Sequence, residues 1–143
     1  MKKVAIYAQS YSIKSEKEIY VLLEILEKKN IEIVFEETFH NLLFENNYIS
    51  KKYPTFSHFN HLSNSFDFMF TIGGDGTILR AVSYIRDLNI PILGINTGRL
   101  GFLATVKKDE IEQAINLLFN KEYTIQERSL LEVNVTPKTK EIS

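Results

Sequence analysis

The chain has 143 residues, which is enough for one domain with a hydrophobic core. Its 17 basic and 18 acidic side chains give a net charge of −1, so no general positive charge favours nucleic acid or an anionic membrane as a partner. The absence of cysteine excludes disulfides, thiolate zinc sites and cysteine nucleophiles.

The first 36 residues predict a strand, a helix and a second strand. Residues 3–8 (KVAIYA) are an apolar run of strand length, too short for a signal peptide, and nothing approaches a membrane span, so we expect a cytoplasmic protein. Ser15 and Glu18 have the spacing of a capping box. Apolar residues then follow at helical spacing: Ile19, Leu22, Leu23 and Leu26. With a strand at 31–36, this order indicates a parallel sheet with a right-handed crossover.

Residues 37–65 do not continue this alternation of strands and helices. They are rich in Asn, Ser and aromatic residues without a sustained period, and we expect a surface excursion, part helix and part loop. The segment holds His40, His58 and His61. The pair His58-x-x-His61 would suit a metal on a helix, but no nearby Cys or carboxylate completes a site. We therefore favour a mobile loop over a metal site.

The α/β pattern then resumes. Residues 66–72 predict a third strand with little polar alternation, which is typical of a sheet covered on both faces. A helix is expected to run to about Leu88, and a fourth strand occupies 90–95. A last helix, with Asp109 and Glu110 in its first turn, is marked by Ile111, Ala114, Ile115 and Leu118.

The predicted fold class is α/β, an open, mostly parallel Rossmann-like sheet with flanking helices. We assign residues 1–122 to this α/β domain. The tail at 123–143 has a different pattern, because Leu131, Val133 and Val135 alternate with polar residues as in a half-buried antiparallel strand. Two strands make a poor sheet on their own, so we expect the tail to hold the first strands of a β-rich domain that is absent here.

The functional signal lies in TIGGDGT, residues 71–77, directly after the third strand. Ligands of open α/β sheets bind at the carboxyl ends of the strands, and a second glycine-rich stretch, 98–101, follows the fourth strand. Gly73, Gly74 and Gly76 would let a phosphate lie against bare backbone amides at a helix N-terminus. Thr77 could cap that helix or donate its hydroxyl to a phosphate, and Arg80 is close enough to reach an anion.

Asp75 is unexpected in a phosphate site, because a carboxylate repels the ligand it faces. It would fit as a base that takes a proton from an attacking hydroxyl, or as a ligand of a metal ion on the phosphates. Both roles indicate phosphoryl transfer. The alternative is a plain turn in which Asp75 caps the helix, and the two preceding glycines make that alternative weaker. The P-loop, G-x-G-x-x-G and G-x-S-x-G motifs do not occur.

The pair of segments GGDGTILRA (73–81) and GINTGRLGFLA (94–104) resembles the NAD kinase family. Phosphofructokinases and lipid kinases that act on diacylglycerol or sphingoid bases carry similar Gly-Gly-Asp-Gly loops. The second segment, with Asn-Thr-Gly-Arg-Leu-Gly-Phe-Leu, is what favours NAD kinase.

This resemblance implies transfer of a phosphoryl group from ATP (or polyphosphate), with a divalent metal such as Mg²⁺, to the 2′-hydroxyl of the adenosine ribose of NAD. It also implies that Asp75 is the base, while no residue of this chain is assigned as a metal ligand. Phe102 would pack near the nucleotide, although the residues alone favour a core position for Phe102 and Leu103. The expected nucleotide-binding residues are Gly73, Gly74, Asp75, Gly76, Thr77, Arg80, Asn96, Gly98, Gly101 and Phe102.

NAD kinases continue into a β-rich C-terminal domain with an Asn-Glu pair and a Gly/Thr-rich segment, and neither motif occurs here. We therefore expect this chain to be an N-terminal half that is inactive alone. The resemblance further implies small-molecule nucleotides as partners and a homo-oligomer formed through the full-length protein. A lipid kinase and a non-catalytic nucleotide-binding module are the alternatives.

Overall fold

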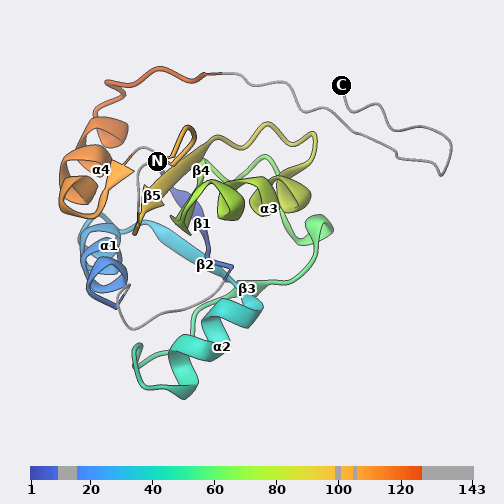
Figure 1. Ribbon diagram of the computed structural model, residues 1–143. Coiled ribbons are helices and arrows are strands. Elements are labelled where there is room, and N and C mark those ends of the chain that lie inside the picture. Colours follow the sequence, from blue (N-terminus) through green and yellow to red (C-terminus); the bar gives the residue numbers. More distant parts are fainter. Residues whose placement is uncertain (10–15, 99–100, 105, 127–143) are drawn as a thin grey trace, which may run out of the picture.

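The centre of the domain is a six-stranded sheet whose strands are all parallel, with the order β3-β2-β1-β4-β5-β6 (Figure 1). This computed structural model describes residues 1–9, 16–98, 101–104 and 106–126. The parallel α/β class predicted from the sequence is confirmed. The strands are β1 (Lys3–Tyr7), β2 (Glu32–Glu36), β3 (Thr55–Phe56), β4 (Phe68–Gly73), β5 (Ile92–Asn96) and β6 (Val106–Lys107).

Helices cover both faces of the sheet. On one face α1 and α4 lie side by side, and α2 packs onto the same core cluster (Figure 1). The other face is covered by α3 and by residues around the short 3₁₀ helix η2 (Phe59–His61). The helices are α1 (Glu16–Lys28), α2 (Glu37–Glu45), α3 (Asp75–Ile85) and α4 (Ile111–Phe119), with the 3₁₀ turn η3 (Lys108–Glu110) directly before α4.

The two central strands explain why the sequence shows apolar runs without alternation. In β1, Val4 and Ile6 face the cluster under α1 and α4, whereas Ala5 and Tyr7 face the cluster under α3. Both faces are therefore buried, as is usual for parallel sheets.

The order of the strands creates a switch point between β1 and β4. The chain builds β1, β2 and β3 in one direction, returns to place β4 beside β1, and then adds β5 and β6 in the other direction. Open α/β sheets bind ligands in the crevice at the carboxyl ends of the strands at such a point. Because β4 ends at Gly73, the first glycine motif stands there.

Residues 37–65 are more integral to the fold than predicted. The helical part is confirmed as α2, which begins after Glu36, whose carboxylate accepts hydrogen bonds from the backbone amides of Thr38 (2.6 Å) and Phe39 (3.3 Å). The idea of a surface excursion is wrong in part, since the segment also adds β3 to the sheet and buries Phe56. A nine-residue helix and a two-residue strand are too short to produce a sustained period.

All three histidines of this segment support the backbone. Buried His40 accepts a hydrogen bond through Nε2 from the amide of Tyr53 (3.0 Å). His61 accepts one through Nδ1 from the amide of Ser57 (3.2 Å), and the His58 side chain caps η2. Within the described ranges, no group of three His, Cys, Asp or Glu side chains could hold a metal ion.

Several element boundaries differ from the prediction. Helix α3 starts inside the glycine motif, at Asp75, and ends at Ile85 because Arg86 has a φ of 51°. Asp109 and Glu110 lie in η3 rather than in the first turn of α4, and β6 was not predicted. The capping box at Ser15 and residues 127–143 of the predicted tail lie outside the described residues. None of the described helices is long and apolar enough to cross a membrane.

Candidate functional site

The first glycine motif combines one glycine that the fold requires with two that face open space. Gly73 has a φ of 150°, and a Cβ on it would lie 2.3 Å from Oγ1 of Thr77. At Gly74 and Gly76 an added Cβ would meet no described atom within 4 Å. The backbone at these two positions is therefore accessible to a ligand at the switch point, next to the N-terminus of α3.

The carboxylate of Asp75 is held by the second loop, which follows β5 and carries Gly98 and Gly101. Its Oδ2 accepts a hydrogen bond from the amide of Phe102 (2.8 Å), and its Oδ1 accepts from the amides of Leu103 (3.0 Å) and Ala104 (2.9 Å). Gly74, not Asp75, is the N-cap of α3. The alternative of a plain turn capped by Asp75 is therefore wrong. Three donors also favour the ionised carboxylate, which is the form needed for accepting a proton.

Gly101 makes this contact possible. A Cβ built on Gly101 would lie 2.3 Å from Oδ1 and 2.5 Å from Oδ2 of Asp75, far closer than real Cβ contacts. Gly98 has no such constraint, since the nearest atom to an added Cβ is 4.0 Å away. The two glycine-rich segments, predicted to lie at the same edge of the sheet, are thus in direct contact through Asp75 and Gly101.

Asn96 fastens the second loop to the end of β5. Its side chain is only 4% exposed. Nδ2 donates to the carbonyl oxygen of Ala104 (3.1 Å), and Oδ1 accepts from the amide of Gly98 (2.8 Å). The amide of Thr97 donates to the carbonyl of Gly73 (3.2 Å), which ties the second loop to the first.

Two large apolar side chains are exposed on the site's two motifs. Phe102 is 89% exposed, so the expectation of a core position is wrong for this residue. Leu79, in α3 one turn after Asp75, is 56% exposed and was missed by the sequence analysis. The signal was present, because Leu79 falls outside the helical stripe of Ile78, Val82 and Ile85. Exposed apolar side chains beside open backbone suit the flat ring of a ligand.

The other predicted residues of α3 have contrasting positions. Thr77 is buried in the first turn and does not cap the helix. Arg80 is exposed, with its charge near the end of β1. Burial raises the pKa of Tyr7, Tyr84 and Glu36 raise it further, and the Arg80 guanidinium opposes them. Arg80 therefore brings positive charge to the switch-point side of α3.

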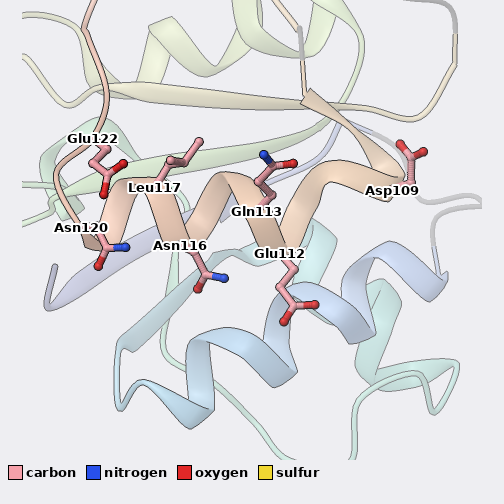
Figure 2. A pocket seen from close by; sticks show the side chains of 7 residues that line it. All are labelled: Asp109, Glu112, Gln113, Asn116, Leu117, Asn120 and Glu122. Carbon is pink, nitrogen blue, oxygen red and sulfur yellow. The ribbon is translucent and has the colours of Figure 1, made fainter.

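One hollow lies near the carboxyl edge of the sheet, and another lies beside α4. The first, of about 320 Å³, adjoins the second loop and is lined by Asn96, Thr97, Gly98, Lys107, Lys108 and Asp109. The second follows one side of α4 and is lined by the residues in Figure 2: Asp109, Glu112, Gln113, Asn116, Leu117, Asn120 and Glu122. This second hollow contains neither a basic side chain nor a glycine loop, so we place the candidate site at the switch point.

A doubly wound parallel sheet with paired glycine loops at its switch point defines the chain as an α/β domain of the Rossmann-like type. The chain belongs to the NAD kinase family, since residues 4–123 match the family described as ATP-NAD kinase N-terminal domain. This confirms the resemblance found in the sequence.

Known relatives extend further than this chain. It is 49% identical over 137 residues to an NAD kinase of Christiangramia forsetii, a match that covers 96% of the chain and 47% of the relative. It is 44% identical over 135 residues to an NAD kinase of Flavobacterium johnsoniae, covering 94% of the chain and 46% of the relative. The chain therefore spans about half the length of the curated relatives it matches.

Solved structures agree on the fold. A yeast NADH kinase in complex with NADH has a TM-score of 0.69 at 19% identity, covering 84% of this chain and 36% of that one. An NAD kinase from Archaeoglobus fulgidus in complex with ATP has a TM-score of 0.54 at 24% identity, covering 84% and 38% respectively. At these identities the likeness establishes the shared fold.

Proposed function

We propose that this chain is the N-terminal part of an NAD kinase, which transfers a phosphoryl group from ATP to the 2′-hydroxyl of the adenosine ribose of NAD and so forms NADP. The observation that carries the proposal is the hydrogen-bonded contact between the two family motifs. The carboxylate of Asp75 stands at the switch point of the sheet, fixed by three backbone amides of the second loop.

Asp75 is the proposed general base. A positioned carboxylate that takes the hydroxyl proton during attack on the phosphorus contributes about 10²–10⁴-fold to a rate. The base must lie within hydrogen-bond reach of the ribose hydroxyl, and the fixed orientation of Asp75 meets the requirement for positioning. A divalent metal such as Mg²⁺ would arrive with the donor phosphates, because the described residues offer no set of three ligand side chains.

The rest of the proposed site binds the nucleotides. The open backbone at Gly74 and Gly76 would approach the phosphates, and Arg80 would neutralise their charge. Exposed Phe102 would pack against a nucleotide ring. Gly73, Thr77, Asn96, Gly98 and Gly101 would shape the loops around these contacts.

The biological setting is proposed from the sequence and the family. We assign residues 1–122 to the nucleotide-binding domain and 123–143 to the start of a β-rich domain that completes the NAD site. The protein would act in the cytoplasm on small-molecule nucleotides, as a homo-oligomer formed through the full-length protein. The phosphoryl donor would be ATP, with polyphosphate as the alternative.

The test is NADP formation from NAD, ATP and Mg²⁺. The chain is compared with a version extended by the C-terminal half of the Christiangramia forsetii relative, and with Asp75→Asn in the extended version. We expect turnover only from the extended protein, and a loss of about 10²–10⁴-fold in kcat for Asp75→Asn without unfolding. An extended protein that binds NAD tightly but forms no NADP supports the non-catalytic alternative. Turnover of diacylglycerol instead of NAD supports the lipid kinase.

A further inference from the structure

The side chains of Asn96 and Asp75 both form a hydrogen bond with Ala104 in the second loop. Asn96 Nδ2 donates to the carbonyl oxygen of Ala104 (3.1 Å), while the amide of Ala104 donates to Oδ1 of Asp75 (2.9 Å). The Asn96 side chain also accepts from the amide of Gly98 (2.8 Å), at the beginning of the loop. Asn96 therefore links the start of the loop to the residue through which the loop holds Asp75.

The two bonds of Asn96 suit an amide side chain. One atom donates to a carbonyl oxygen and another accepts from an N–H, and the asparagine amide supplies the donor and the acceptor on separate atoms. The side chain is 4% exposed, and residue 96 pairs with Gly73 across β4 and β5, so it acts from the rigid end of a strand.

We propose that Asn96 is a positioning residue for phosphoryl transfer, which orients the Asp75 carboxylate by fixing the loop amides of Phe102, Leu103 and Ala104. The inference rests on the proposed role of Asp75 as the base. Asn96 acts through Ala104 and not by contact with the reacting atoms. Without the Asn96 bonds the loop can move away from Asp75. Asp75 then loses both its orientation and the donors that favour its ionised form.

The test uses Asn96→Ala in the version extended by the C-terminal half of the Christiangramia forsetii relative. We expect kcat to fall about 10–100-fold, as for a base displaced by about 1 Å, while KM for NAD changes less than about threefold. The acid limb of the kcat–pH profile should move to higher pH, because fewer hydrogen bonds then favour the charged carboxylate. A purely structural role would leave that limb unmoved. The matched control is Asn46→Ala, which removes another side-chain bond to a carbonyl oxygen, that of Leu42 (2.7 Å), far from the glycine loops in the sequence.

Two further variants separate the possible outcomes. If Asn96→Ala does not fold, Asn96→Asp measured at neutral pH takes its place. The aspartate keeps the acceptor for the amide of Gly98 and loses the donor to the carbonyl oxygen of Ala104. Gly101→Ala displaces Asp75 directly and should reproduce the lower kcat. Wild-type kcat in the Asn96 variant that is measured, or an unmoved acid limb in Asn96→Ala, overturns the proposal about Asn96. If Asp75→Asn itself retains full activity, Asp75 is not the base and the premise of this inference fails, whereas an extended protein that forms no NADP refutes the proposed function.

Discussion

The bonds between Asp75 and the second loop predict that the carboxylate stabilises the domain. Asp75→Ala removes the acceptors for the amides of Phe102, Leu103 and Ala104, whereas Asp75→Asn can keep two of these bonds if its carbonyl oxygen takes the place of Oδ1. The amide group of the asparagine would then face the amide of Phe102, donor against donor. The alanine variant should therefore be the less stable of the two.

The magnitude follows from the exposure of the bonds. A hydrogen bond to a charged group contributes about 1.5–3 kcal/mol when both partners are buried. The contact to Phe102 is exposed and the other two are part-buried, so water replaces part of each lost bond. At about 1 kcal/mol for each bond, Asp75→Ala should cost about 3 kcal/mol and Asp75→Asn about 1 kcal/mol. For a domain of this size these costs lower Tm by about 10 °C and about 4 °C.

Thermal unfolding of the chain at pH 7, followed by far-UV circular dichroism, measures both variants. Asp87→Ala is the matched control, since Asp87 is exposed just beyond α3, and its change should stay within about 0.5 kcal/mol. If Asp75→Ala is as stable as the wild type, the three bonds contribute no net stability and our account of the loop is refuted.

Three other substitutions test different parts of the site and the fold. Phe102→Ala should raise KM for NAD in the extended protein severalfold with little change in Tm, because the ring is 89% exposed; an unchanged KM would remove Phe102 from the site. Gly73→Ala should cost about 2–3 kcal/mol in urea unfolding, since it adds backbone strain and a contact 2.3 Å from Thr77 Oγ1. Burial acts to raise the pKa of Asp67, but two backbone amides near the N-terminus and the terminal charge outweigh it and hold the pKa below 3.8. Asp67 therefore stabilises the fold above its unfolded pKa, and the benefit disappears as the pH falls through its lower folded pKa, so Asp67→Asn should flatten the stability profile below about pH 4.

Much of the fold follows from the sequence because local patterns determine it. The apolar runs at 3–8 and 66–72 became the two central strands, and the helical stripe from Ile19 to Leu26 became the buried face of α1. The two short strands could not be predicted from local patterns, because β3 and β6 have two residues each and exist only through pairing with a neighbouring strand.

The location of the candidate site also follows from the sequence, since glycine-rich stretches after parallel strands must meet at one edge of the sheet. The partners of Asp75 could not be predicted. The hydrogen bonds to Phe102, Leu103 and Ala104 go to backbone amides 27 to 29 residues away, which carry no signature in the side-chain sequence. The exposure of Phe102 was equally hidden, because an apolar residue within a glycine loop is compatible with the core or the surface.

Asp75 thus has an observed role in joining the two loops and a proposed role as the base, and a single substitution would confuse the two. Asp75→Asn weakens the contact that joins the two loops and also removes the proposed base, so a loss of activity alone does not identify the base. Gly101→Ala displaces the carboxylate and leaves its chemistry intact, with a Cβ that would stand 2.3 Å from Oδ1. If Asp75 is the base, Gly101→Ala should retain a carboxylate-dependent pH profile at a reduced kcat, whereas Asp75→Asn should lose the acid limb altogether. Identical flat profiles in both variants would assign Asp75 to the architecture of the loops alone.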